Sequence, residues 1–198
     1  MIKIGLTGGI ASGKSSISAH LSGIGAYVID ADKVARLIMR GDVLQRVRAG
    51  FGDEYFFANG TLDRKKLAST IFSDYAARKF LEGITLPAIL HEIERQLLLA
   101  EQSGLSAAIV DAPTLIESGA YKLVNEIWLI NAGNLQTERL MARDGISYEQ
   151  AQARIASQMP YEEKLPYATH IIDNTKTLEA AQRQAEELWQ SAISKARK

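Results

Sequence analysis

The chain has 198 residues, of which 46% are hydrophobic and 23% charged, enough for one α/β domain with an inserted subdomain. The 23 acidic and 23 basic residues cancel, so the overall charge indicates neither a nucleic-acid partner nor a membrane surface. The sequence has no cysteine, which excludes disulfides and thiolate chemistry and fits a reducing compartment. Because we find neither a signal peptide nor a membrane-spanning run, we expect a cytoplasmic protein.

The first forty residues predict strands that alternate with helices. Residues 2–6 form an apolar, β-branched run that ends at a glycine pair, as a buried strand does. A helix is expected over 14–21, where Gly23 and Gly25 end it. A second strand over 26–30 and a helix over about 32–40 follow. This βαβ-type opening is typical of a parallel sheet covered by helices.

Residues 41–104 have a different character. Four helical patterns occur here, over 43–49, 64–72, 76–82 and 87–102, and none of the segments reads as a buried strand. The fourth helix is expected to begin at its proline, because proline is tolerated in the first turn. We therefore predict an inserted helical subdomain.

Strand patterns resume after residue 104. Three further apolar runs of buried-strand length occupy 107–111, 127–130 and 170–173. Helices are expected over 119–124, 136–143, 148–157 (opened by a capping box at Ser147 and Gln150) and 177–196. Five strands alternating with helices predict a doubly wound parallel sheet.

A phosphate-binding motif lies between the first strand and the first helix. The segment Gly8-Gly9-Ile10-Ala11-Ser12-Gly13-Lys14-Ser15 fits G-x-x-x-x-G-K-[ST] at every fixed position. Its glycines let successive backbone N–H groups turn toward an anion, and the helix N-terminus adds positive potential. Lys14 is expected to reach the β- and γ-phosphates, Ser15 to bind Mg²⁺, and Ser16 to face the α-phosphate. The motif alone fits GTPases, ATPases and kinases.

Carboxylates follow two of the predicted strands. Asp30 and Asp32 lie at the end of the second strand, where ligands bind in open parallel sheets. Asp32 is interpreted either as a base or Mg²⁺ ligand or as the cap of the next helix, and Asp30 as structural. Asp111 ends the third strand as a Walker B acid does, and a metal role and a structural role stay equally open.

Arginines gather on the helices between residues 136 and 157. Arg139 and Arg143 are four residues apart and share one helix face, with Arg154 on the next helix. Arginine forks match phosphate oxygens, so we favour a phosphate-covering lid. The alternative is a solvated basic face balanced by Glu138, Asp144 and Glu149.

These segments together resemble the dephospho-coenzyme A kinase family over almost the whole chain. The opening Leu6-Thr7-Gly8-Gly9-Ile10 is more selective than the generic loop, and Ile29-Asp30-Ala31-Asp32 is similar to the family's second signature. The lid and C-terminal block of the family are matched by residues 139–145, Arg154, residues 158–160, Glu163-Lys164 and residues 172–174. The chain departs from the family at Leu86, Thr114 and Thr169, which concerns contacts on the substrate side.

The resemblance implies a P-loop NTPase fold whose nucleotide-binding core comprises residues 1–34, 105–137 and 167–198. It also implies a helical substrate domain over 35–104 and a lid over 138–166. The implied reaction transfers the ATP γ-phosphate, with Mg²⁺, to the ribose 3′-hydroxyl of dephospho-coenzyme A. Asp32 would be the base, with Lys14 and Arg139 catalytic. The implied ATP contacts are residues 9–16, Arg143 and Asn174 near the base, and the implied Mg²⁺ ligands are Ser15, Asp32 and Asp111.

Other readings were weighed against this one. The first is another P-loop kinase, acting on a nucleoside monophosphate, shikimate or a sugar acid. The second is a GTP-dependent switch, but the chain lacks the Asn-Lys-x-Asp motif that recognises guanine. The third is an inactive binding module, which is disfavoured because Lys14, Ser15 and Asp32 are intact. We expect a monomer whose partners are ATP and dephospho-coenzyme A, with no nucleic acid and no membrane.

Overall fold

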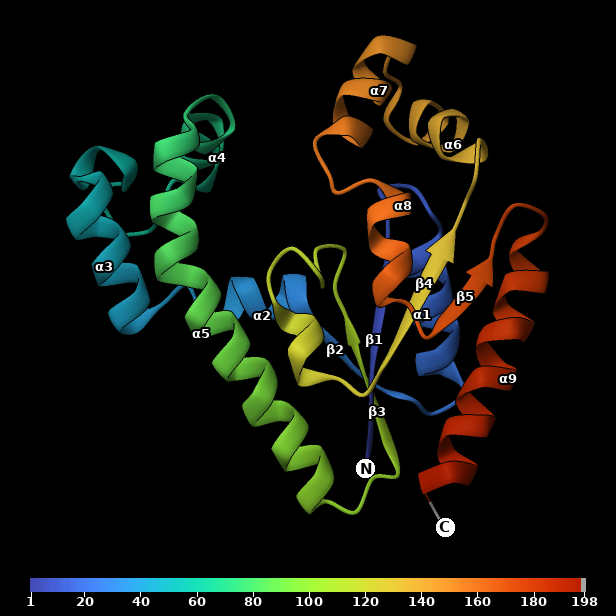
Figure 1. Cartoon of the computed structure of the whole chain (residues 1–198). Coiled ribbons are helices and arrows are strands. Elements are labelled where there is room, and N and C mark those ends of the chain that lie inside the picture. Colours follow the sequence, from blue (N-terminus) through green and yellow to red (C-terminus); the bar gives the residue numbers. More distant parts are fainter. Residues whose placement is uncertain (197–198) are drawn as a thin grey trace. The chain divides into compact units, whose positions relative to one another are not determined.

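The computed structural model describes residues 1–196 and contains a five-stranded parallel sheet in the order β2-β3-β1-β4-β5 (Figure 1). Its strands are β1 (Ile2–Gly8), β2 (Tyr27–Asp30), β3 (Ala107–Asp111), β4 (Glu126–Asn131) and β5 (His170–Asp173). The predicted strands and the doubly wound sheet are therefore confirmed. Because all pairings are parallel, the carboxyl ends of the strands meet at one edge, where ligands bind in such sheets.

The chain divides into two compact units. The first joins Met1–Asp30 to the residues from Gln96 onward and holds the sheet, and the second is Ala31–Arg95. The second unit contains α2 (Ala31–Ile38), α3 (Gly41–Phe51), the 3₁₀ turn η1 (Asp53–Tyr55), α4 (Arg64–Ser73) and most of α5 (Tyr75–Gln102). It has a small core of its own, in which Val47, Leu67 and Ile84 are buried.

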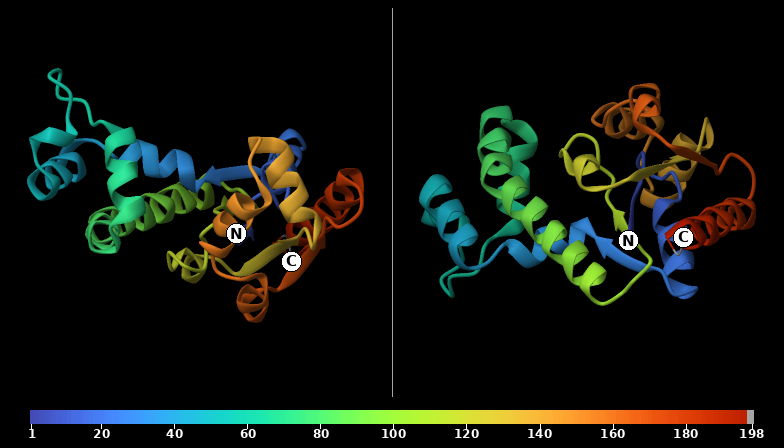
Figure 2. Two further views of the ribbon diagram at one scale, coloured as in Figure 1. Left: turned by 90° about the horizontal axis from the view of Figure 1, so that it is seen from above. Right: turned by 60° about the horizontal axis from the view of Figure 1, so that its bottom comes forward.

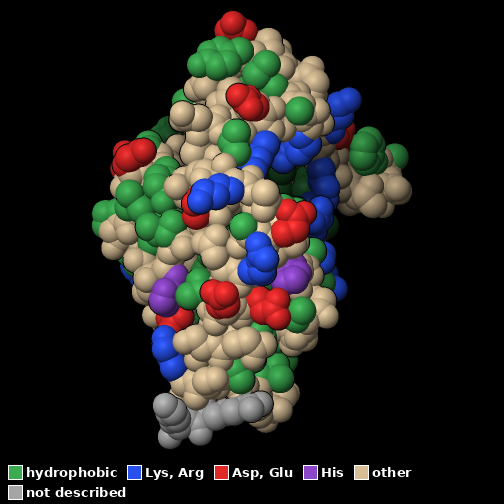
Figure 3. All heavy atoms as spheres, turned by 90° about the vertical axis from the view of Figure 1, so that its right-hand side faces the viewer, with side chains coloured by type: hydrophobic (Ala, Val, Ile, Leu, Met, Phe, Trp, Pro, Cys, Tyr) green, Lys and Arg blue, Asp and Glu red, His purple; other side chains and the backbone are tan. Residues whose placement is uncertain are grey.

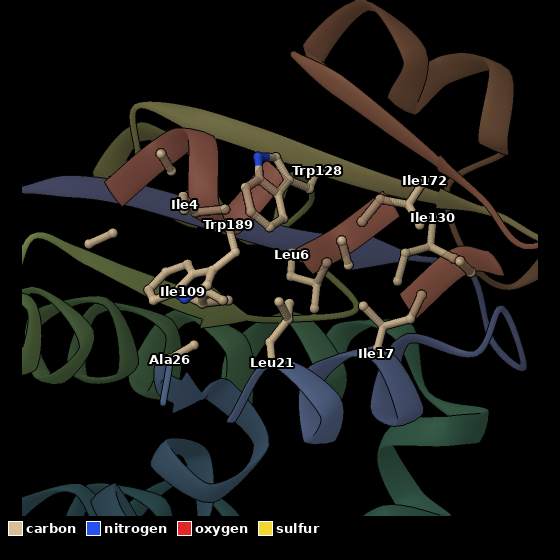
Figure 4. Packing of buried hydrophobic residues seen from close by; sticks show 14 residues of the cluster. Ile4, Leu6, Ile17, Leu21, Ala26, Ile109, Trp128, Ile130, Ile172 and Trp189 are labelled. Atoms are coloured by element: carbon tan, nitrogen blue, oxygen red, sulfur yellow. The ribbon is translucent and has the colours of Figure 1, made fainter. Parts of the chain in front are cut away.

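One face of the sheet is covered by α1 (Lys14–Gly23) and α9 (Leu178–Ala196), which lie side by side (Figures 1 and 2). Ile17 and Leu21 are four residues apart, so both point from α1 to the sheet, where they meet Leu6 (Figure 4). Helix α9 completes this core with one buried side, which is formed by Ala181, Ala185, Trp189 and Ala192. Complete burial of each large side chain stabilises the fold by about 1.5–3 kcal/mol. Because β1 and α1 are both packed in this core, the two ends of the loop that joins them are held in place.

Helix α5 corrects one prediction. We expected one helix over 76–82 and a second that begins at Pro87, but a single helix runs through the proline. The proline removes one backbone donor, yet the residue four positions earlier is Gly83, beside which the structure leaves open space. Ile84, Ile93 and Leu97 continue the buried stripe across this point. Tertiary packing therefore outweighs the local cost of the proline.

Helices α6 (Leu135–Asp144), α7 (Tyr148–Ala156) and α8 (Tyr161–Lys164) follow β4, and α6 and α7 lie beyond the carboxyl end of that strand (Figure 1). The predicted capping box is present, since the side chains of Ser147 and Gln150 each accept a hydrogen bond from the backbone N–H of the other residue. The 3₁₀ turns η2 (Ala120–Leu123) and η3 (Leu165–Tyr167) flank this region, and η2 confirms the short helix expected there. Helix α8 was not predicted, because four residues carry too little periodicity.

The surface matches the balanced composition. Acidic and basic side chains are interspersed on the face that carries α9 (Figure 3). Within residues 1–196, none of the helices combines the length and apolar character that a membrane crossing requires.

Candidate active site

The segment between β1 and α1 forms a tight loop at the carboxyl edge of the sheet. The N–H of Ser12 donates to the carbonyl of Gly9 at 3.1 Å, which closes the turn. Ala11 has a φ of 58° and Gly13 a φ of 90°, so the backbone is left-handed at both positions. Such a conformation is costly for alanine and is retained mainly at functional sites. Gly13 precedes the first turn of α1 without a side-chain cap, so no side chain competes with an anion for the N–H groups at the start of the helix.

Lys14 points from the start of α1 to the neighbouring strand. Its ammonium group forms an ion pair with the Asp111 carboxylate, and both side chains are largely buried. Asp111 lies opposite Asp30 in the register of β2 and β3. The strand ends thus bring the motif lysine together with the expected Walker B acid. Ser15 and Ser16, the next residues of α1, are exposed.

Asn174 holds the loop through a hydrogen bond to its backbone. This residue follows β5, is 1% exposed, and donates from Nδ2 to the carbonyl of Ser12 at 2.7 Å. A Cβ atom on Gly13 would lie 2.2 Å from the same Nδ2 atom, so the loop and the amide fit only with glycine there. Asn174 Oδ1 and Ser12 Oγ are buried without a hydrogen-bond partner among residues 1–196. These atoms are unused polar groups directly beside the loop.

Two glutamines reach the tip of the loop from the region of α6 and α7. Gln136 donates from Nε2 to the carbonyl of Ile10 at 2.8 Å, and the N–H of Ile10 donates to Oε1 of Gln158, also at 2.8 Å. A cavity of about 450 Å³ lies beside them and is lined by the loop, the end of β4 and the segment from α7 to α8. It is large enough for part of a nucleotide-sized ligand.

The arginines of α6 have different surroundings. One guanidinium nitrogen of Arg139 is buried and has no partner in the part of the chain that the structure describes. Arg143 is exposed and bonds Asp144 at 2.7 and 3.1 Å, and Arg154 contacts the same carboxylate at 2.5 Å. The hydrogen bond from Arg143 holds the pKa of Asp144 below its usual value and raises that of Arg143. Arg139 therefore has a free donor for an anion, whereas Arg143 already has a counterion.

Lys164 joins the end of α8 to the loop that follows β3. It is 1% exposed, and its ammonium group lies 2.9 Å from the Glu117 carboxylate and 3.2 Å from the Pro113 carbonyl. The Thr7 hydroxyl donates to the same carbonyl at 3.2 Å. A buried, paired lysine thus fixes the segment just beyond Asp111.

Asp32 is the second residue of α2 and is exposed. It belongs to the second unit, but it lies only two residues beyond Asp30, which limits their Cα separation to about 7 Å. No cluster of three or more acidic or histidine side chains suited to a metal occurs within residues 1–196. Mg²⁺ tolerates few protein ligands when phosphates and water supply the rest, so the Ser15 hydroxyl and a nearby carboxylate fit this ion.

The fold and the loop together define a P-loop kinase architecture. Shikimate kinase from Acinetobacter baumannii has the same fold, with a TM-score of 0.57 at 15% identity over 98% of this chain and 94% of that one. A family model described as dephospho-CoA kinase matches residues 2–180. The chain belongs to the dephospho-CoA kinase family.

Individual relatives agree with this assignment. The dephospho-CoA kinase of Geobacter sulfurreducens is 47% identical over 189 residues, which cover 94% of this chain and 96% of the relative. The solved structure of dephospho-CoA kinase from Campylobacter jejuni has a TM-score of 0.75 at 31% identity, with 97% of both chains covered. The comparisons therefore extend over nearly the full length.

Sequence reasoning assigned no role to Gln136 or Gln158. The two glutamines contact a residue 126 and 148 positions away, and no local pattern indicates such a pairing. Lys164 was grouped with the arginines of the predicted lid and with the family's C-terminal block, but its pairing with Glu117 was not predicted.

Proposed function

We propose that the protein transfers the γ-phosphate of ATP to the ribose 3′-hydroxyl of dephospho-coenzyme A, which gives coenzyme A and ADP. The observation that carries this proposal is the loop of residues 8–15 at the carboxyl end of β1, with Lys14 beside Asp111. The loop offers backbone donors and a lysine to a triphosphate. The choice of dephospho-coenzyme A as the acceptor rests on membership of the dephospho-CoA kinase family.

The nucleotide phosphates would bind along the loop, over the predicted contact range of residues 9–16. Ile10 would lie in this range without donating to a phosphate, because its N–H is bonded to Gln158. Lys14 would leave Asp111 for the β- and γ-phosphates, and the unpaired nitrogen of Arg139 would meet the transferring group. These cations stabilise charge that spreads over the phosphoryl oxygens in the transition state. Arg143 would join them only by giving up part of its contact with Asp144.

Mg²⁺ would be held by Ser15 with a carboxylate, for which Asp111 and Asp32 are the candidates. When bound, the ion neutralises phosphate charge and orients the γ-phosphate for in-line attack. Asn174 was predicted near the ATP base. Its bond to the Ser12 carbonyl supports a role in holding the loop, and its free Oδ1 atom is compatible with a further ligand contact.

Asp32 is the proposed base that receives the proton of the 3′-hydroxyl. Its place after β2, whose last residue pairs with Asp111, supports this role. We assign residues 35–104 to a helical substrate domain and residues 138–166 to a lid that excludes water. The departures at Leu86, Thr114 and Thr169 would change contacts to the acceptor and leave the phosphoryl transfer intact. The protein would act as a monomer in the cytoplasm.

The direct test is phosphate transfer from [γ-³²P]ATP to dephospho-coenzyme A, with shikimate, a nucleoside monophosphate and gluconate as competing acceptors. We expect transfer to dephospho-coenzyme A alone and its loss in Lys14→Ala. A faster reaction with another acceptor would refute the assignment of substrate.

The role of Asp32 has its own test. We expect Asp32→Asn to bind ATP normally and to lower kcat by about 10²–10⁴-fold, the usual contribution of a general base. Asp42→Asn is the matched control, because Asp42 is another exposed acid in the first turn of a helix. Near-normal turnover in Asp32→Asn would remove this residue from the mechanism.

A further inference from the structure

The loop residue Ile10 is held by two amide side chains at once. Its carbonyl accepts from Gln136 Nε2 and its N–H donates to Gln158 Oε1, each at 2.8 Å. Both glutamines are partly buried. One side chain must present its amide nitrogen and the other its oxygen, because the two backbone groups of Ile10 differ in polarity. We call this arrangement the amide clamp.

The amide clamp lies next to a strained backbone position of the loop. Ile10 directly precedes Ala11, whose φ of 58° is left-handed. A non-glycine residue is disfavoured in this region and needs support from its surroundings. With its N–H directed to Gln158, Ile10 offers no donor to a phosphate. The donors for the anion are then other N–H groups of the loop and of the start of α1, apart from those of Ser12 and Ser16, which donate to backbone carbonyls.

The amide clamp also sets the distance between two phosphate-binding parts. Gln136 and Arg139 are three residues apart on α6, so they lie on neighbouring positions of one helix face. The amide that holds Ile10 therefore also places the guanidinium with the unpaired buried nitrogen. Gln152 donates to the Thr137 hydroxyl at 3.0 Å, a contact between α7 and α6 that does not involve Ile10.

We propose that Gln136 and Gln158 are positioning residues that fix the phosphate loop and Arg139 in one arrangement for ATP. This inference rests on the proposed use of ATP. It assigns to Gln158 of the lid, together with Gln136 just before the lid, a part in forming the nucleotide site. Because Ile10 belongs to the loop assigned to the ATP phosphates, the amide clamp should govern the steady-state constants for ATP and leave the KM for dephospho-coenzyme A unchanged.

The first experiment replaces each amide by a side chain of similar length without hydrogen bonds. We expect Gln136→Met and Gln158→Met each to raise the KM for ATP by about two- to tenfold, the effect of one partly buried hydrogen bond. The KM for dephospho-coenzyme A should stay within twofold. Gln152→Met is the matched control, because it removes a glutamine contact between α7 and α6 that does not involve the loop, and its KM for ATP should be that of the wild type.

The second experiment separates the amide clamp from simple electrostatics. Gln158→Glu keeps an acceptor for the Ile10 N–H, whereas Gln158→Lys replaces it with a cation. The amide clamp predicts that the glutamate variant keeps slow hydrogen exchange at the Ile10 amide and the lower KM for ATP. A charge effect on ATP alone predicts the reverse order of KM values.

Two results would overturn the proposal. One is a KM for ATP in both methionine variants within twofold of the wild type. The other is a lower KM in Gln158→Lys than in Gln158→Glu. Hydrogen exchange at Ile10 is measured without substrate, so the amide clamp is tested even if the protein fails to phosphorylate dephospho-coenzyme A.

Discussion

Replacement of Gly13 by alanine tests whether the loop and Asn174 are as closely fitted as the structure indicates. Gly13 has a φ of 90° and a ψ of 8°, and a Cβ atom there would lie 2.2 Å from Asn174 Nδ2. Asn174 is 1% exposed and cannot move away without losing its bond to the Ser12 carbonyl. We expect Gly13→Ala to destabilise the first unit and to weaken ATP binding.

The expected magnitude has two parts. A left-handed alanine costs about 1–2 kcal/mol. Displacement of a buried amide from its hydrogen bond adds about 1–3 kcal/mol. The free energy of unfolding should therefore fall by about 2–5 kcal/mol in Gly13→Ala.

The assay is urea unfolding followed by far-ultraviolet circular dichroism, with the free energy extrapolated linearly to zero urea. Gly25→Ala is the matched control, because Gly25 has a φ of 93° and open space where its Cβ would be. This control isolates the backbone cost of about 1–2 kcal/mol. The double variant Gly13→Ala/Asn174→Ala should recover part of the excess loss. If Gly13→Ala costs no more than Gly25→Ala, the close contact with Asn174 is refuted.

Two further outcomes follow from the arginines and from a partly buried carboxylate. Arg139→Met should lower kcat/KM for ATP by about a hundredfold or more, and Arg143→Met by less than tenfold, because only Arg139 has an unpaired buried donor; equal losses in steady-state assays would contradict this. Burial raises the pKa of Glu126, but hydrogen bonds from Lys195 and Trp128 outweigh it and hold the pKa below 4.5. A carboxyl group whose pKa is lowered by folding stabilises the folded protein at every pH above its pKa in the unfolded chain. Glu126→Gln should therefore lower the free energy of unfolding at pH 7, by at most about 1 kcal/mol. This difference should shrink in thermal unfolding as the pH falls below 4.5 and through the lowered pKa of folded Glu126; a difference that does not change with pH would show that packing is its cause.

The sheet and the phosphate loop could be predicted because their signals are local. Each strand is a short run of apolar residues, and the loop is a motif of eight positions in which every fixed residue has a chemical reason. Pro87 shows the limit of local signals, because the proline indicates a helix start whereas buried neighbours on both sides carry α5 through it.

The surroundings of the loop could be predicted only in part. Arg139 and Arg143 look equivalent in sequence, yet Asp144 pairs with Arg143, and Arg139 keeps a buried nitrogen without a partner among residues 1–196. The amide clamp depends on side chains more than a hundred positions from Ile10. Such contacts follow from the tertiary structure, and no periodicity or spacing in the sequence records them.

The position of β1 in the sheet has a consequence for how the protein is made. This first strand of the chain is also the central one, and its two neighbours are β3 and β4. Strand β2 pairs with β3 alone among the strands. Neither early strand can therefore find its partner until residue 107 has left the ribosome, a delay of about 5–20 s at common synthesis rates. During that time residues 2–8 and 27–30 are without their native sheet partners, and unpaired strand edges of this kind are the sites at which nascent chains in general aggregate or bind chaperones.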